Sequence, residues 1–441
     1  MKKLSKLLAV VLAVLMLATA FVGCHEKGEI AFKVGDSEFT SAFFSCTQFF
    51  AANTARSAID AYVKENKLDE KNIDYEDYKF DKDGNVAKEG TPYETFVREQ
   101  AIKTLRENAA LDAWMNAENL KLDDDTVNGV SWEALSFWNY GCDYNTYYQY
   151  AQMGMESQLA SYYTPYAFIL SENGIAYETY LEYRKYDAKY DFYFKHLYDE
   201  GGSKEVSKDD VTKYMDEHFV LGDYITFSKK DSDNKDLSKE KLEALKAIAD
   251  KYAERLNAGE DFKTINDEET KRLEEEKKAN TSSNSSTTSS NGSSTASGTS
   301  SVTSSEATSS NDTSSTTTSS STTSSGETKY SPESYKGLYG DKDSGYDDKL
   351  FAEYKKQELD KAVVIDDTEN AQYILFVKRD MFDDEYEDYW YDGLRPNILY
   401  LLKQDEFDKS LDEKGNSLSL TEDTHATSPF DVDDIKFELE D

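Results

Sequence analysis

The sequence predicts an α+β protein that is mainly helical, and three observations support this class. Before residue 205, apolar residues recur every three or four positions over long stretches, which is the period of an amphipathic helix. Residues 206–228 join a short helix directly to a strand rich in β-branched and aromatic residues. After residue 228, a few strand-like runs alternate with helices. We therefore expect a helical half, a smaller α/β half and a C-terminal helix.

The 441-residue chain is strongly acidic, with a formal net charge of −37. Residues 1–23 carry three lysines and no acid, so the chain without them has a charge of −37 − 3 = −40. Nucleic-acid phosphates demand Lys and Arg, so this balance argues against a nucleic-acid partner. Three Cys and four His leave little for metal or thiol chemistry, and the sequence has no HExxH, GxSxG or Walker pattern. We expect neither a cofactor nor a bound metal.

The N-terminus has the pattern of an exported lipoprotein. Three lysines precede an apolar run over residues 7–22, which is short for a membrane-spanning helix. The run ends in Phe21-Val22-Gly23-Cys24, which resembles a bacterial lipobox. This resemblance implies cleavage before Cys24 and a lipid anchor on that residue, which places the protein outside the cytoplasm on the bacterial cell membrane. The alternative is an ordinary signal peptide with a chance Cys.

The helical half is expected to begin with a strand and turn over residues 30–36. A first predicted helix follows and ends near residue 62. Further helices are predicted over residues 96–120, 127–137 and 177–198. The Tyr-rich last helix favours a packed core, although its aromatic stripe could also line a binding surface. Aromatic residues from Phe43-Phe44 through Tyr183 and Tyr190 could line a crevice for apolar stretches. Cys46 and Cys142 could form a disulfide, which the sequence alone does not decide.

A short helix and strand join the two halves. Ser207 stands three residues before Asp210, which is the spacing of a capping box. The apolar stripe that follows consists of Val211, Met215 and Phe219. Gly222 is expected to end this pattern, and residues 224–227 are expected to form the first strand of the second domain.

The second domain continues with a helix that begins at Ser238 and stops at Gly259. Residues 281–325 contain 35 Ser or Thr in 45 positions, so they cannot bury enough apolar surface and are predicted to be a disordered, dispensable insertion. O-glycosylation of this tract is an open alternative. Beyond it, the sequence predicts a helix over residues 346–359, strands over 363–365 and 371–377, a C-terminal helix and a last strand within 429–437.

Several of these segments resemble PrsA- and SurA-type foldases. Residues 206–228 resemble the V(T/S)DEEV…YY helix that leads into the first strand of a parvulin domain, and residues 371–377 are similar to the family's final GYHIIKV strand. Residues 30–41 resemble the hAxVNGxxIT…F start of SurA-like domains, and residues 119–125 resemble their GLxLxDEE junction. The resemblance implies a helical chaperone domain with a smaller parvulin-like domain inserted before a C-terminal helix that packs back on the helical domain.

The resemblance also indicates where catalytic residues would lie. Family enzymes place one His in the first strand of the parvulin domain and another in the last, and these positions here hold Tyr224 and Tyr373. The Gly-Gly loop of the family is replaced by the Ser/Thr tract. A tyrosine hydroxyl can donate a hydrogen bond, but two strand tyrosines are more commonly core residues. Peptidyl-prolyl isomerase activity is therefore expected to be weak or absent.

The predicted organisation is a signal peptide (1–23), a SurA-like helical domain (24–205), a linking helix (206–222), a parvulin-like domain in two parts (223–279 and 329–380) around the insert (280–328), and a C-terminal helix and tail (381–441). Its expected function is to bind unfolded exported polypeptides at the membrane. One alternative is a surface lipoprotein that binds carbohydrate or another solute, because acids and aromatics also suit sugar recognition. Another is a structural surface protein that uses the Ser/Thr tract as a spacer.

Overall fold

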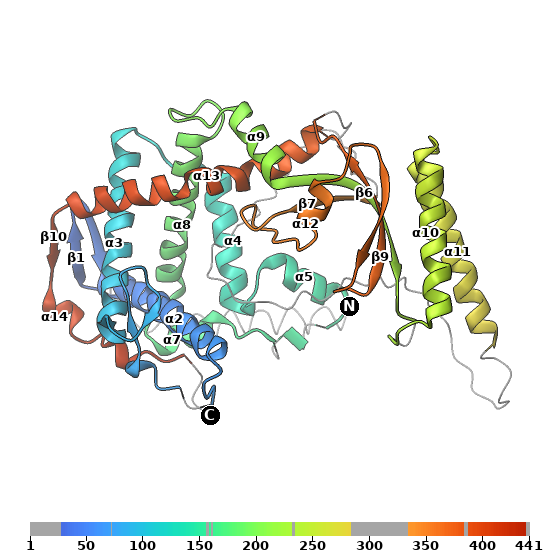
Figure 1. Ribbon diagram of the computed structural model, residues 1–441. Coiled ribbons are helices and arrows are strands. Elements are labelled where there is room, and N and C mark those ends of the chain that lie inside the picture. Colours follow the sequence, from blue (N-terminus) through green and yellow to red (C-terminus); the bar gives the residue numbers. More distant parts are fainter. Residues whose placement is uncertain are drawn as a thin grey trace, which may run out of the picture. The chain divides into compact units, whose positions relative to one another are not determined.

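The computed structural model describes residues 28–71, 73–155, 158–159, 162–231, 234–283, 334–382 and 387–437. They form a mainly helical α+β protein with small antiparallel sheets, which confirms the predicted class (Figure 1). The described residues divide into two compact units: the first comprises those up to Leu197 and from Asp405 onward, and the second comprises those from Tyr198 to Gln404. No helix in these ranges combines the length and apolar character needed to cross a membrane.

The first unit is built mainly from helices. They are α2 (Ser41–Glu65), α3 (Tyr93–Ala117), α4 (Asp124–Tyr140), α5 (Tyr144–Gln152), α7 (Tyr166–Glu172), α8 (Tyr177–Tyr198, whose last residue belongs to the second unit) and the short α14 (Thr424–Thr427). Thr40 caps α2 by accepting a hydrogen bond from the backbone N–H of Phe43 at 3.2 Å. Buried residues of α2 and α3 recur at helical spacing, so the two long helices pack along their apolar faces.

Two three-stranded antiparallel sheets complete the first unit. The strands are β1 (Ile30–Val34), β2 (Ser37–Thr40) and β10 (Leu420–Glu422) in one sheet, and β3 (Lys79–Phe80), β4 (Val86–Ala87) and β5 (Thr91–Pro92) in the other. Strand β10 pairs with β1, so the C-terminal segment joins the N-terminal strand (Figure 1). Near the chain end, the ring of Phe437 stacks on that of Phe49 with centroids 5.5 Å apart. The C-terminal segment is therefore part of the core of this unit.

The second unit is organised around a four-stranded antiparallel sheet with the strand order β7-β6-β9-β8. In chain order its elements are α9 (Lys208–His218), β6 (Phe219–Ser228), α10 (Lys239–Asn257), α11 (Phe262–Ser283), β7 (Lys336–Gly340), α12 (Phe351–Lys355), β8 (Ala362–Asp367) and β9 (Gln372–Arg379). Helix α13 (Glu387–Ser417) follows and has residues in both units. The first and last strands of this sheet, β6 and β9, are neighbours along eight residue pairs.

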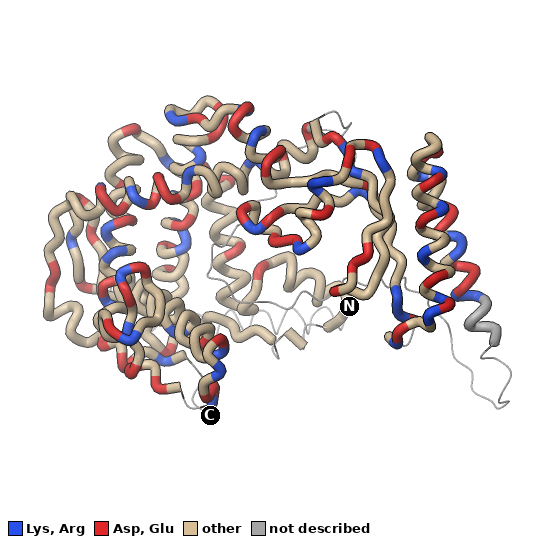
Figure 2. Tube along the Cα trace, viewed as in Figure 1, with Lys and Arg blue, Asp and Glu red and all other residues tan. Residues whose placement is uncertain are grey.

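Each face of the sheet carries its own apolar cluster. One face packs against α10 and α11 through Tyr252, Phe262 and Ile265. The other packs against α12 through Tyr354. Figure 1 shows α10 and α11 side by side, and Figure 2 shows that both carry many acidic and basic residues. The sheet is thus covered on both faces, as alternation of side chains along its strands requires.

Most predicted helices are confirmed, but three predictions near element ends are wrong. The linking helix ends at His218, so Phe219 and Gly222 lie in β6 and not in the helix. The helix predicted over residues 346–359 is limited to α12. A strand is not found within residues 429–437, where the described chain forms a 3₁₀ turn at Val432–Asp434. Segment 281–325 lies outside the described residues, apart from the end of α11.

Candidate functional site

Tyr224 and Tyr373, the two tyrosines at the expected histidine positions, do not converge on one site. In the ladder between β6 and β9, Tyr224 pairs with Phe376 and Phe227 pairs with Tyr373. Tyr224 and Phe227 are three residues apart, so their side chains point to opposite faces of the sheet. Tyr224 belongs to the cluster under α12, whereas Tyr373 packs with Phe227 in the cluster under α10. The sequence predicts strands at both residues but does not determine the register between them.

The sheet face that carries Tyr224 is lined with aromatic rings and has no histidine. Tyr354 lies 4.3 Å from Tyr339 and 4.5 Å from Phe376, measured between ring centroids, and Tyr224 meets Tyr339 edge to face at 6.0 Å. Ile374 of β9 faces the same way as Phe376 and belongs to the same apolar cluster. Burial raises the pKa of the Tyr339 hydroxyl far above its ordinary value, so this group stays neutral. The face is an apolar core with few groups able to transfer a proton.

One exposed aromatic feature of the first unit is a group of stacked tyrosines at the junction of α4 and α5. We call Tyr140, Tyr144, Tyr147 and Tyr148 the tyrosine cluster. The rings of Tyr140 and Tyr147 stack at 3.8 Å, and Tyr144 lies 6.4 Å from Tyr147 and 6.1 Å from Tyr148. Burial raises the pKa of Tyr140 to about 12, with a further contribution from its hydrogen bond to Tyr147. The Tyr140 hydroxyl is therefore neutral at neutral pH, and the four rings form a continuous aromatic surface.

Local backbone signals hold α5 in place at the end of α4. Gly141 ends α4 with φ +73°, and a Cβ at this position would lie 2.4 Å from the carbonyl oxygen of Thr164, so only glycine fits. Asp143 then caps α5 by accepting hydrogen bonds from the backbone N–H of Thr146 at 2.9 Å and from its hydroxyl at 2.6 Å. Ser136 of α4 donates a hydrogen bond to the carbonyl of Cys142 at 2.9 Å. These contacts fix the turn between α4 and α5 and so position the tyrosine cluster.

Helix α5 has no buried residue at all, which is unusual for a helix of a folded unit. Tyr144 and Tyr148 are each 50% exposed and Tyr140 is 37% exposed. On α4, Trp132 is 65% exposed and Leu135 lies one turn further along. Figure 2 shows α4 and α5 almost free of basic residues. Exposed apolar surface of this kind commonly marks an interaction site.

The aromatic residues expected to line a crevice are core residues. Phe43 and Phe44 are buried, and Phe44 packs on Phe32 with ring centroids 4.7 Å apart. Tyr183 stacks on Phe50 at 4.7 Å, and Tyr190 donates a hydrogen bond to Asp408 at 2.5 Å. These residues lie at helical spacing, and that spacing indicates a core more directly than a binding surface. The sequence signal for the tyrosine cluster is the segment YNTYYQYAQ, which is rich in tyrosine but lacks an apolar stripe.

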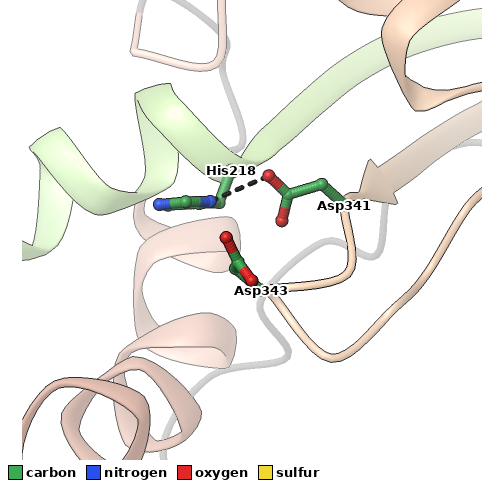
Figure 3. Close-up of side chains that lie close together, drawn as sticks. All are labelled: His218, Asp341 and Asp343. Atoms are coloured by element: carbon green, nitrogen blue, oxygen red, sulfur yellow. Dashed lines mark hydrogen bonds and ion pairs between the residues drawn. The ribbon is translucent and has the colours of Figure 1, made fainter.

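A second polar group lies in the second unit where α9 meets β6. His218 Nδ1 lies 2.8 Å from Asp341 Oδ2, and Asp343 extends from the same loop as Asp341 (Figure 3). The candidate ligand atoms of these three side chains lie within 4.8 Å of one another. One imidazole and two carboxylates are donors that a divalent or transition-metal ion accepts.

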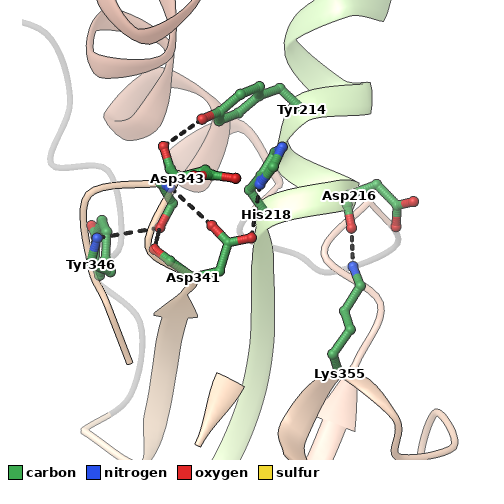
Figure 4. Close-up of polar contacts among 8 residues, drawn as sticks. Tyr214, Asp216, His218, Asp341, Asp343, Tyr346 and Lys355 are labelled. Carbon is green, nitrogen blue, oxygen red and sulfur yellow. Dashed lines mark hydrogen bonds and ion pairs between the residues drawn. The ribbon is translucent and has the colours of Figure 1, made fainter. Parts of the chain in front are cut away.

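The contacts around this group show that it joins α9 to the loop after β7. Tyr214 donates a hydrogen bond to the carbonyl of Asp343 at 2.7 Å, and Asp341 accepts one from the backbone N–H of Ser344 at 2.9 Å (Figure 4). The backbone N–H of Asp341 donates to the carbonyl of His218 at 3.2 Å. Lys355 bonds the carbonyl of Asp216 nearby. These contacts give the His218 and Asp341 side chains protein partners and hold the backbone of Asp343, so loop structure accounts for the arrangement.

Two other predictions concern cysteines. Cys24, the expected lipidation site, lies outside the described residues. Cys46 and Cys142 are both buried and are free thiols, so the disulfide left open by the sequence is absent from this structure. Burial raises the pKa of the Cys46 thiol well above its ordinary value, which makes it a poor nucleophile.

Comparison of the chain with protein-family models, with curated proteins and with solved structures found no match.

Proposed function

We propose that this protein is an extracytoplasmic chaperone, anchored by a lipid on Cys24, that binds unfolded exported polypeptides and has little or no peptidyl-prolyl isomerase activity. The observation that carries the proposal is the tyrosine cluster: α5 buries none of its residues and presents stacked rings to solvent. Aromatic rings contribute large contact areas with few rotatable bonds, so they hold varied partners at low entropic cost.

The second unit supports the part of the proposal that concerns catalysis. An isomerase must act on an amide with a rotation barrier of about 18–20 kcal/mol. Tyr224 and Tyr373 point to opposite faces of the sheet, and β6, β7, β8 and β9 contain no histidine. A pair of proton-transferring side chains on one face of the sheet is therefore not available from these two positions. The proposed activity is therefore the binding of polypeptides without catalysis of rotation about their prolyl peptide bonds.

The test measures aggregation and refolding separately. The protein should slow the aggregation of a chemically unfolded client at substoichiometric to equimolar ratios. It should leave a proline-limited refolding step, which lasts tens to hundreds of seconds, almost unchanged. Replacing Tyr144 and Tyr148 together by Ala should weaken client binding about tenfold, because aromatic anchors dominate many interfaces.

The matched control is Tyr389→Ala, which removes a 41% exposed tyrosine from α13 in the second unit. This variant should protect the client as well as the unmodified chain does. Faster refolding that Tyr224→Phe with Tyr373→Phe abolishes would contradict the proposal and make the tyrosines catalytic. No effect on aggregation, together with binding of soluble glycans, would support the carbohydrate-binding alternative. Cys24→Ser should release the protein from the membrane fraction if the anchor is correct.

A further inference from the structure

Several tyrosine rings in this protein have a Lys or Arg side chain of the same chain close to the ring face. The guanidinium of Arg56 lies 3.9 Å from the centroid of the Tyr75 ring, and Lys189 Nζ lies 3.9 Å from that of Tyr186. In the second unit, Lys229 Nζ lies 4.4 Å from the centroid of the Tyr373 ring. The negative face of an aromatic ring attracts such cations at distances up to about 6 Å. The chain therefore uses cation–π contacts repeatedly.

The tyrosine cluster lies in a stretch with no cation of its own. Residues 122–183 contain eleven Tyr and nine Asp or Glu, but no Lys or Arg. Among the described residues, the cation–π contacts involve other rings and none of the four in the cluster. Asp143, which caps α5, adds a negative charge beside the rings. The exposed ring faces are thus suited to a cation from another molecule.

We infer that the tyrosine cluster selects segments of unfolded polypeptide in which Lys or Arg stands beside apolar residues. This inference rests on the proposed function and specifies its client chemistry. The cationic head group lies over a ring face, and the aliphatic stem of the same side chain covers the ring edge. The net charge of −37 favours the approach of basic segments over longer distances, and salt weakens that contribution. The cluster supplies the short-range part, which salt weakens less.

The experiment uses the full chain and three fluorescent peptides of equal length and equal leucine content, with Lys, Gln or Glu at the remaining positions. Dissociation constants are measured by fluorescence anisotropy at an ionic strength of about 0.15 M, where exposed charges more than about 8 Å apart are largely screened. The Lys peptide should bind about fivefold more tightly than the Gln peptide, and the Glu peptide should bind most weakly.

Two double variants distinguish the contribution of the aromatic ring faces from that of apolar surface alone. Tyr144→Leu with Tyr148→Leu keeps apolar side chains but removes two ring faces, so the Gln peptide should bind nearly as before while the preference for Lys is lost. Tyr144→Phe with Tyr148→Phe keeps the rings and should retain the preference. Tyr389→Leu is the matched control outside the cluster and should behave like the unmodified chain.

The outcomes distinguish this inference from the proposed function. Equal binding of the Lys and Gln peptides would overturn the inference and leave the chaperone proposal standing. A preference for Lys that survives in the Leu variant would also overturn it, because the net charge of the chain would then be the cause. Failure of all three peptides to bind would overturn the inference and the proposed function together.

Discussion

Gly222 illustrates how a single missing side chain sets the packing of the sheet. It lies within β6, where it pairs with Lys378 of β9, and its Cα faces the cluster under α12. The ring of Phe376 covers this position so closely that a Cβ would lie 2.2 Å from its Cε2 atom. Phe376 is fully buried, so the ring has little freedom to move away.

Gly222→Ala should therefore destabilise the second unit by about 1–3 kcal/mol through overpacking. Thermal or urea unfolding, followed by a probe in the second unit, measures the change. Gly129→Ala is the matched control: Gly129 lies in α4 with nothing within 4 Å of an added Cβ, so alanine should stabilise that helix by up to about 1 kcal/mol. Equal stability of the Gly222 variant and the unmodified chain would show that the ring does not cover this site.

Glu107 gives the first unit a pH-dependent stability. Lys103 Nζ lies 3.4 Å from Glu107 on α3 and 3.3 Å from Asp412 on α13. Burial raises the pKa of the Glu107 carboxyl from 4.5 to about 7; Lys103 opposes this rise and Asp412 adds to it. Between these two pH values the folded state keeps a proton that the unfolded state has lost, so stability falls as the pH rises.

The free energy of unfolding of the first unit should therefore decrease by about 2 kcal/mol between pH 4.5 and pH 7 through this group. Glu107→Gln should flatten that dependence, because an amide does not ionise. Urea unfolding at several pH values tests it, with Glu99→Gln, an exposed change on the same helix, as the control. An unaltered pH slope in the Glu107 variant would exclude this carboxyl as the cause.

At the scale of elements, capping signals gave the most reliable predictions. Ser207 accepts a hydrogen bond from the backbone N–H of Asp210 at 3.1 Å, as the capping-box spacing predicts, and its hydroxyl donates one to the Asp210 carboxylate at 2.7 Å. Ser238 caps α10 by accepting a hydrogen bond from the backbone N–H of Lys241 at 3.4 Å, and Gly259, with φ +94°, follows the end of this helix. These signals are local, so they are readable before the fold is known.

Ser207→Ala should cost the second unit about 1 kcal/mol, because it leaves an amide at the start of α9 without its side-chain acceptor. Ser207→Asp should restore most of the loss, since a carboxylate accepts the same bond and complements the helix dipole. Unfolding curves for both variants provide the measurement. A destabilisation by Asp as large as that by Ala would indicate that capping is not the role of this residue.

The wrong predictions depend on contacts that are distant in the sequence. Phe219 continues the apolar stripe of α9, but it pairs with Gly340 of β7, and this ladder extends the strand back to Phe219, directly after the last residue of α9. Strand β10 is only three residues long and forms by pairing with β1, almost 400 residues earlier in the chain. The opposite orientations of Tyr224 and Tyr373 likewise follow from a register that the sequence does not contain.

At the scale of the whole molecule, the two units have different surfaces and different roles in the proposal. The first unit exposes the tyrosine cluster on helices that carry no Lys or Arg. The second unit packs the aromatic rings of its sheet against helices on both faces. The proposal therefore places client binding in the first unit. It gives Tyr224 and Tyr373 in the sheet of the second unit no catalytic role.

The most direct test of client binding is site-specific photo-cross-linking. A photoreactive phenylalanine analogue replaces Tyr144 in one protein and Tyr389 in another, and each is illuminated with an unfolded client and with the same client after folding. We predict strong cross-links from position 144 to the unfolded client, few to the folded client, and few from position 389 to either. Cross-links of equal yield from both positions, or none from position 144 while the client is still protected from aggregation, would contradict the account.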